Sequence, residues 1–406
     1  MNAFDIDAYS PAQMAARVEN AGITKGNMNA VSTLVLAMLA GAFISFGAVF
    51  YTFVIHDSTL SLGLTRLLGG FVFCLGLILV IVAGAELFTG NSLIVMAYVS
   101  RKITGWQLCR NWLTVYIGNL AGALVIVILI YYSGHLSTAN GAIGLLAVRI
   151  ANAKVNLTFM EALFRGILCN LLVCLAVWLC FSGRSVTDKI LAILFPITAF
   201  VALGFEHCIA NMYFIPAGLA VKNDPALLQQ ALVLANGSLN IDNLNTGSFL
   251  LNNLLPVTLG NIIGGGFFVG AVYWFVYLRR QAVEPIRDLM TRGPPSVTPE
   301  ATVAEVVSVM KQHNTGSVLV GELGHAQGIV AESDIVRKVI SLGLDIKQVK
   351  VADIMSVPLI TIDIKTPVYE IYRTMAERKI RHIIITDNNE QVGFLSVKDV
   401  LRRPII

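Results

Sequence analysis

The stretch GAELFTGN occupies residues 84–91, and a related stretch, GFEHCIAN, occupies residues 204–211. Each places a glutamate beside a glycine in the middle of a long hydrophobic segment. An ionisable side chain inside a membrane span is costly, so such a residue marks a functional site by default. Each stretch therefore predicts a membrane span that is interrupted at its centre.

The hydrophobic segments around these stretches are long enough to cross a bilayer, which takes roughly 20 apolar residues. Because Glu86 and Glu206 only interrupt longer stretches, the uncharged runs combine into six spans, of which the second and fifth are broken. The runs without Asp, Glu, Lys or Arg cover residues 26–56, 67–85, 111–148, 166–183, 190–205, 207–221 and 243–278.

A second pair of similar strings links the two halves of this region. The string GNLAGA at residues 118–123 in the third span resembles GNIIGG at residues 260–265 in the sixth. Small residues of this kind let helix backbones approach closely. Broken spans at matching positions of two three-span halves predict an inverted repeat, because such halves insert in opposite orientations.

Composition divides the chain near residue 280. The 406 residues are 56% hydrophobic and only 13% charged, which excludes an ordinary soluble enzyme. Residues 1–280 hold 14 basic and 10 acidic side chains, whereas residues 281–406 hold 15 of each. The first part is typical of a membrane protein and the second of a soluble domain. The balanced charge of the second part gives no support to nucleic-acid binding.

The positions of Lys and Arg predict the orientation. They gather in the loops after the second and fourth spans and at the end of the sixth, which all fall on one side. By the positive-inside rule this side is cytoplasmic, so both termini are expected inside a bacterial-type plasma membrane. Residues 1–26 are expected to form a cytoplasmic amphipathic helix that starts at Ser10-Pro11. None of the six cysteines forms a CxxC pair, so no metal site is expected.

Several strings together resemble the formate/nitrite transporter family, and most closely its formate channels. The resemblance covers nearly all of residues 1–280 and implies six helices in an aquaporin-like protomer over residues 27–280, a pore in each protomer, a homopentamer and no cofactor in the membrane part. The strings are AGAFISFG (40–47), FCLGL (73–77), GAELFTGN (84–91), NWLTVYIGNLAGA (111–123), GILCNLLVCLAVW (166–178), GFEHCIANM (204–212) and LLPVTLGNIIGGG (254–266).

The resemblance also implies roles for individual residues. It makes His207 the pore histidine and Thr89 the polar residue of the loop that interrupts the second helix. Glu86 departs from the pattern, because the formate channels are expected to have aspartate there. The narrow apolar constrictions match Phe73, Leu77 and Phe200, and the residues around the histidine match Lys154, Asn170, Glu206 and Asn211.

Physical chemistry supports a proton-coupled pathway for small monovalent anions. Moving an ionised carboxylate into an apolar medium costs tens of kcal/mol in the ideal limit. Protonating an acid with a pKa near 4 at pH 7 costs only about 4 kcal/mol. A histidine between apolar constrictions can supply that proton or a hydrogen bond, since its ordinary pKa is about 6.5. Lys154 would attract anions by its positive potential.

Three alternatives remain open. The permeant anion is formate by overall resemblance, but nitrite and hydrosulfide fit the same chemistry. An enzyme that uses Glu206 and His207 as an acid/base pair is disfavoured, because no nucleophile, metal cluster or phosphate loop accompanies them. A membrane-anchored nucleotide sensor is disfavoured by the intramembrane charges.

The soluble part contains an internal repeat of constant period. Asp288-Leu289-Met290 recurs as Asp353-Ile354-Met355, Gly328 as Gly393 and Asp334 as Asp399. Each unit is expected to contain a helix, two apolar strands and a second helix. The first helices are expected over residues 301–312 and 367–378, and the second ones from near Asp334 and Asp399. The strands are expected over 317–320, 328–330, 382–386 and 393–396.

The strings GIVAESDIV (328–336) and GFLSVKDVL (393–401) resemble the CBS-domain signature. The resemblance implies a tandem CBS module over residues 281–406, an α/β domain with units at about 284–345 and 349–406. Such a module commonly binds an adenine nucleotide: AMP, ADP or ATP.

By this resemblance, Asp334 and Asp399 would accept hydrogen bonds from ribose hydroxyls. Ser396 would bind phosphate at a helix N-terminus, and Arg381 is a weaker phosphate candidate. The module is expected to have two nucleotide clefts. Ala331 stands in the first unit where Ser or Thr is usual, so one of the two clefts is expected to be empty or purely structural. A helix-start aspartate can also be a simple cap, which leaves open an assembly platform without ligand. The short connection after Arg280 favours regulation of the channel by the module.

Overall fold

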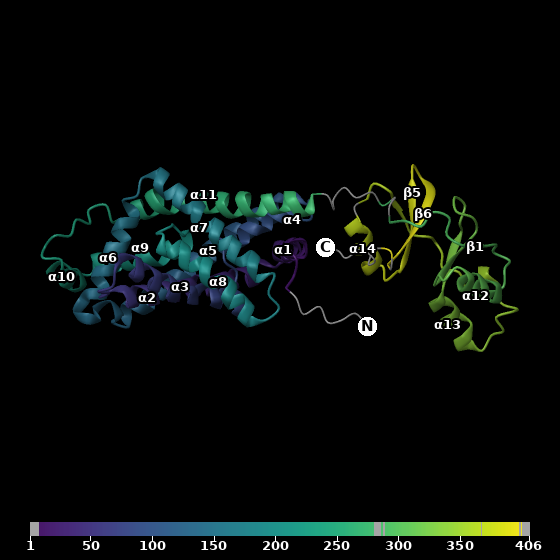
Figure 1. The fold of residues 1–406 in the computed structure, drawn as a ribbon, viewed down its shortest axis with the longest axis horizontal. Helices are drawn as coiled ribbons and strands as arrows, with labels where there is room; N and C mark the ends of the chain where they lie inside the picture. The colour runs from purple at the N-terminus through teal and green to yellow at the C-terminus, as the bar shows by residue number, and fades with distance from the viewer. Residues whose placement is uncertain (1–7, 280–285, 287–288, 367, 398, 400–406) are drawn as a thin grey trace. The chain divides into compact units, whose positions relative to one another are not determined.

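The computed structural model describes residues 8–279, 286, 289–366, 368–397 and 399. It divides into two compact units, residues 1–279 and 280–406. The first unit is helical, and the second combines helices with strands (Figure 1).

The first unit contains helices of very different lengths. Their bounds are α1 Pro11–Asn27, α2 Ala30–Ile55, α3 Leu62–Ala83, the 3₁₀ turn η1 Gly90–Ile94, α4 Val95–Val99, α5 Gly105–Tyr132, α6 Ala142–Val155, α7 Phe159–Cys180, α8 Val186–Ala202, α9 Cys208–Asn223, α10 Pro225–Leu234 and α11 Leu255–Ile262. Helix α11 continues in both directions through π-helical turns, which makes one helix over Ser248–Leu278.

Five of the described helices are long and apolar enough to cross a membrane: α2, α3, α5, α7 and the helix over Ser248–Leu278. Helices α8 and α9 have 17 and 16 residues and are shorter than this. The prediction of one segment over residues 111–148 is wrong in its extent, because α5 ends at Tyr132. Gly134 and Gly141 adopt positive φ there, so α6 forms a separate helix.

The two predicted interruptions are confirmed. Helix α3 is capped by Gly84 with φ of 80°, and α8 ends just before Gly204 with φ of 73°. Residues in this left-handed region end helices, and glycine reaches it without strain. The chain then runs through short non-helical segments to η1 and α9. Two helix starts thus lie in the middle of the unit.

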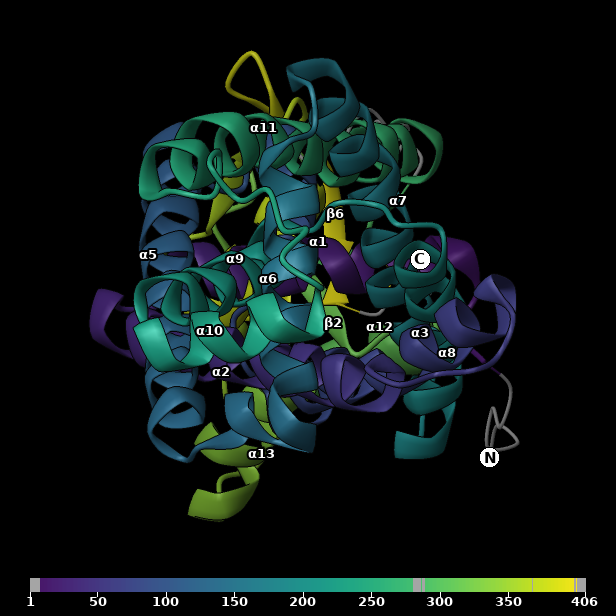
Figure 2. The ribbon, with the colours of Figure 1, turned by 90° about the vertical axis from the view of Figure 1, so that its left-hand side faces the viewer.

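Helix α9 forms the centre of the first unit. Residues 208–218 are all buried, and Figure 2 shows α9 near the middle of the end-on view, with α2, α3, α5, α7 and α11 around it. Two helix pairs, α2–α5 and α7–α11, pack at backbone distance. A Cβ atom at Gly122 would overlap the Met38 carbonyl, and one at Gly264 would overlap the Ile167 carbonyl.

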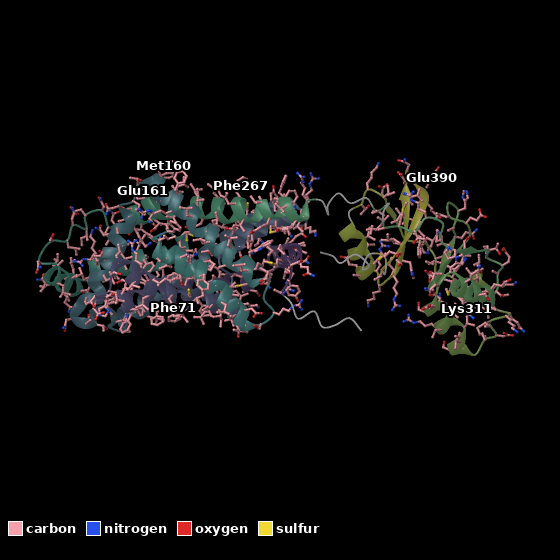
Figure 3. All side chains as sticks on the ribbon, in the orientation of Figure 1. Phe71, Met160, Glu161, Phe267, Lys311 and Glu390 are labelled. Carbon is pink, nitrogen blue, oxygen red and sulfur yellow. The ribbon has the colours of Figure 1, made fainter. Side chains whose placement is uncertain are left out.

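The surfaces of the two units differ in kind. Phe71, Met160 and Phe267 point outward from the first unit with more than half of their surface exposed (Figure 3). Lys311 and Glu390 are exposed on the second unit. Exposed apolar side chains in this number are typical of a surface that lies against lipid or another subunit.

The second unit contains two three-stranded sheets of the same topology. In each, a parallel pair is followed by an antiparallel pair, in the orders β1-β2-β3 and β4-β5-β6. The elements are β1 Ser296–Val297, α12 Val303–Gln312, β2 Ser317–Val320, β3 Gly328–Ala331, α13 Glu332–Lys338, β4 Thr361–Asp363, α14 Val368–Glu377, β5 His382–Asp387 and β6 Glu390–Ser396. The expected helix near Asp399 lies largely outside the described residues.

The strand registers reproduce the repeat. Ser317 pairs with Ala331, and the residues that follow them by one period, His382 and Ser396, pair in the same way. The turn at the start of each CBS repeat packs against the sheet of the other repeat. Met290, in the first repeat, contacts Gly393 of the second, and Met355, in the second repeat, contacts Gly328 of the first. The two CBS repeats therefore share one folded domain.

Candidate functional site

A histidine and a threonine meet between the two interrupted helices. His207 Nε2 lies 3.0 Å from Thr89 Oγ1, and both side chains are buried. His207 also caps α9, since its Nδ1 accepts the Ala210 N–H at 3.0 Å. A nitrogen that accepts carries no proton, so in the neutral ring the proton is on Nε2 and points at Thr89. The Thr89 hydroxyl hydrogen is then available to a ligand.

Aromatic rings close the space beside this pair. Phe200 stacks on His207 with ring centroids 5.9 Å apart and contacts Phe73 edge-on at 5.8 Å. The structure thus brings together four of the residues that the sequence singled out. Leu77 lies one turn beyond Phe73 on α3 and is also buried. Phe214, which sequence reasoning missed, stacks on Phe73 at 6.5 Å.

Asn170 holds the first interrupted loop beside the histidine. Its Nδ2 lies 3.2 Å from the Thr89 carbonyl, 3.1 Å from Ser92 Oγ and 2.6 Å from the Asn261 carbonyl. The Cys174 thiol also donates to the Thr89 carbonyl, at 3.3 Å. Asn170 therefore fixes the position of Thr89, which in turn contacts His207.

Glu206 lies at the centre of a buried polar cluster. Its Oε1 pairs with Lys154 Nζ at 2.8 Å. Its Oε2 accepts from Asn211 Nδ2 at 2.7 Å and from Asn253 Nδ2 at 3.3 Å. The Lys154 ammonium also lies 5.5 Å from the centre of the Phe214 ring. Three of the predicted residues are thus grouped, and the carboxylate of Glu206 largely compensates the charge of Lys154.

A matching cluster surrounds Glu86. Its Oε1 pairs with Lys25 Nζ at 3.0 Å, and its Oε2 accepts from Asn91 Nδ2 at 2.7 Å. Asn91 Nδ2 also donates to Asn111 Oδ1 at 2.9 Å, as Asn211 Nδ2 donates to a second asparagine in the Glu206 cluster. Sequence reasoning missed Lys25 and Asn111. Asn91 could have been predicted, because it ends GAELFTGN at the same place where Asn211 ends GFEHCIAN.

Asn119 and Asn261 hold the two interruptions in the same way. Asn119 Oδ1 accepts the Phe88 N–H, and its Nδ2 donates to two backbone carbonyls, one of them that of Glu86. Asn261 repeats this with the N–H of Cys208 and two carbonyls, one of them that of Glu206. The bonded loop residues occupy the same places in GAELFTGN and GFEHCIAN, and the asparagines occupy the same place in GNLAGA and GNIIGG. The similarity of GNLAGA and GNIIGG was therefore the sequence signal for these two asparagines.

The histidine and threonine break this correspondence. When the two stretches are aligned, Leu87 stands opposite His207, and Ile209 stands opposite Thr89. The groups that stabilise the broken backbone are therefore present in both halves. The two that meet at the centre, Thr89 and His207, are present only once in the two aligned stretches.

In the second unit, Asp334 has both carboxylate oxygens engaged. Oδ2 accepts the Ala331 N–H at 3.0 Å, which caps α13. Oδ1 pairs with Lys338 Nζ at 3.0 Å and accepts from Ser356 Oγ at 3.2 Å. Lys338 Nζ in turn donates to the Ile354 carbonyl at 2.6 Å.

Asp399 also acts as a cap, with one oxygen. Its Oδ2 accepts from the Ser396 N–H at 2.9 Å and from Ser396 Oγ at 2.6 Å. Among the described residues, Oδ1 of Asp399 has no such partner. Arg381 is exposed just before β5, the strand that pairs with Ser396. The two CBS units thus differ at the aspartate that was predicted to bind ribose.

Comparisons with known proteins agree with the division of the chain into a membrane part and a CBS part. The formate/nitrite transporter model matches residues 12–275, and the CBS domain model matches residues 286–341 and 351–405. The formate channel FocA of Escherichia coli K12 is 48% identical over 279 residues, which cover 68% of this chain and 97% of FocA. The uncharacterised transporter YrhG of Bacillus subtilis is 40% identical over 66% of this chain and 94% of its own length.

A solved structure described as a pentameric formate channel with formate bound is 44% identical. It aligns with a TM-score of 0.57 over 62% of this chain and 98% of that one. Its match covers a share of the chain similar to that of the family model. The chain therefore belongs to the formate/nitrite transporter family and carries a tandem pair of CBS domains in its second unit.

Proposed function

We propose that the protein is a channel for formate and related small monovalent weak-acid anions, with proton-coupled passage at His207 and regulation by an adenine nucleotide at the CBS pair. In this proposal α8 and α9 together make the fifth of six spans, and the two halves form an aquaporin-like inverted repeat. The chain assembles as a homopentamer in a bacterial-type plasma membrane, with both termini in the cytoplasm.

The observation that carries the proposal is the buried Thr89–His207 pair next to the Phe73–Phe200 contact. A polar pair with a free hydroxyl hydrogen, enclosed by aromatic rings, fits a small anion that must shed its water and its charge. Helix α9 starts beside this pair, and the N-terminus of a helix favours anions.

The protonation step follows from the His207 geometry. The neutral ring donates through Nε2 to Thr89, which orients the threonine hydroxyl toward the anion. Transfer of a proton from an imidazolium requires a protonated Nδ1, and a protonated Nδ1 cannot accept the Ala210 N–H. Protonation of His207 is therefore coupled to release of the α9 cap. A lost cap costs about 1 kcal/mol, a barrier that thermal motion overcomes.

Flux into proteoliposomes tests the channel. The full chain should conduct formate under a pH gradient, a more acidic outside should accelerate uptake, and vesicles without protein should show neither effect. Nitrite and hydrosulfide are measured in the same vesicles, and a larger flux for either would replace formate as the substrate. Absence of flux for all three anions from folded, inserted protein would contradict the proposal and favour a nucleotide sensor.

The second CBS unit is the proposed nucleotide site. Among the described residues, Oδ1 of Asp399 has no partner and is left for ribose hydroxyls. Ser396 precedes the expected helix, whose start would favour phosphate, and Arg381 is exposed just before β5. Asp334 is already engaged by Lys338 and Ser356. We therefore expect one adenine nucleotide per chain, with the first cleft structural.

Calorimetric titration of the full chain with AMP, ADP and ATP checks this expectation. Asp399→Ala should weaken binding at least about tenfold, because it removes a charge-assisted hydrogen bond. Asp334→Ala is the matched control and should change the affinity less than about threefold. If Asp334→Ala weakened binding more than Asp399→Ala, the site would lie in the first CBS unit. If no nucleotide bound, the CBS pair would be an assembly platform without ligand. Flux with and without the bound nucleotide then tests regulation.

A further inference from the structure

A cavity with a volume of about 360 Å³ lies between α1, α3 and the first interrupted loop. Its lining includes Leu77 and Glu86. This volume lies within the range of about 300–1,000 Å³ that is typical of sites for organic ligands, and it is far larger than formate needs.

One part of the cavity lining is strongly positive. Arg17, Lys25 and Lys189 line it, and Glu86 is the only acidic residue among the described residues of the lining. Lys25 is already paired with Glu86 and bonded to Asn91 at 2.8 Å. Within the described part of the chain, Arg17 and Lys189 have no carboxylate in ion-pair distance. Two cations are therefore available to an anion that enters the cavity.

Apart from Asn91, the rest of the described lining is apolar or glycine. Leu77 is one turn from Phe73, so the apolar side of the cavity adjoins the constriction. Most of the other apolar side chains come from α1, α3, the first interrupted loop with η1, and the C-terminal end of α7. They include Val18, Val80, Ile81, Leu87, Leu93 and Val177.

We propose that this cavity binds an amphiphilic organic monoanion larger than the permeant anion, and that the bound ligand blocks the pathway at Leu77. The acidic group lies at Arg17 and Lys189, and a short alkyl chain covers Leu77 and its apolar neighbours. The blocking step rests on the proposed channel function, whereas the binding step rests on the cavity alone. Formate is too small to contact both sides, so permeation and blockade use different contacts.

A series of linear alkanesulfonates from ethane- to hexanesulfonate tests the proposal. A sulfonate stays ionised, so it does not cross the bilayer as a neutral acid. It is added on both sides of proteoliposomes that contain the full chain. Each methylene buried against the apolar wall should lower the concentration for half-inhibition of formate flux about fourfold. Hexanesulfonamide, which is neutral and of equal length, should inhibit at least about tenfold more weakly.

Variants separate the cavity from an effect on the lipid. The double variant Arg17→Gln, Lys189→Gln should raise the half-inhibitory concentration of hexanesulfonate at least about tenfold. Arg184→Gln is the matched control. Arg184 stacks on Tyr9 at 4.2 Å as Arg17 does at 4.1 Å, but it does not line the cavity. It should leave inhibition unchanged.

Direct binding distinguishes the two proposals. Calorimetry of hexanesulfonate with the detergent-solubilised full chain should show binding that the double variant loses. Binding without any formate flux would contradict the proposed channel and support the ligand site. Flux without inhibition or binding would overturn the ligand site, as would inhibition that is independent of alkyl length or equal in the double variant.

Discussion

Replacing His207 with asparagine should abolish proton-coupled formate uptake and leave the protein folded. Asparagine can still accept the Ala210 N–H and cap α9, but it does not titrate near neutral pH. Proton transfer by a positioned side chain typically contributes about 10²–10⁴-fold to a rate. We therefore expect uptake under a pH gradient to fall at least about hundredfold, with the midpoint of thermal unfolding unchanged within about 2 °C.

Thr89 offers a matched pair of variants for the same site. Thr89→Val keeps the shape and removes the hydroxyl that bonds His207 Nε2, so it should lower flux by a similar factor. Thr89→Ser keeps the hydroxyl and should retain at least about a third of the flux. If His207→Asn keeps its proton-coupled flux, or if Thr89→Val and Thr89→Ser behave alike, the pair does not carry the proton step.

Replacing Asn119 or Asn261 with leucine should unfold or strongly destabilise the channel part. Each asparagine bonds two backbone groups of an interruption, where the chain has no helical partners, and one carbonyl of a neighbouring helix. A buried polar group without a partner costs about 1–3 kcal/mol, so loss of the two bonds to the interruption should cost each variant about 2–6 kcal/mol. This is a large part of the roughly 5–15 kcal/mol that stabilises a folded protein.

Size-exclusion chromatography and thermal unfolding in detergent measure this loss. Both variants should give little folded protein or an unfolding midpoint at least about 6 °C lower. Asn156→Leu is the control, since Asn156 is exposed and its bonds can be replaced by water. Because the two asparagines make corresponding bonds, they should behave alike. A severe effect at only one of them would contradict equivalent roles in the two halves.

Local patterns in the sequence were sufficient for the class of protein and for the position of its breaks. Uncharged runs long enough for a bilayer identified the membrane part, because hydrophobic length is a property of consecutive residues. Gly84 and Gly204 marked the interruptions for the same reason. The period of the repeat predicted corresponding strands in the two CBS units, and the structure gives these strands matching registers. The single run over 111–148 failed because Gly134 and Gly141 end helices without a charge.

Only the tertiary structure decided which polar groups meet. Lys25 and Glu86 are far apart along the chain, as are Lys154 and Glu206, so no local pattern joins them. It also placed Asn170 on the carbonyl of Thr89, the partner of His207, and it engaged Asp334 with Lys338 and Ser356. The sequence shows which costly groups are buried, because burial follows from hydrophobic context. Their partners depend on how distant helices pack, since only packing brings a donor within about 3 Å of its acceptor.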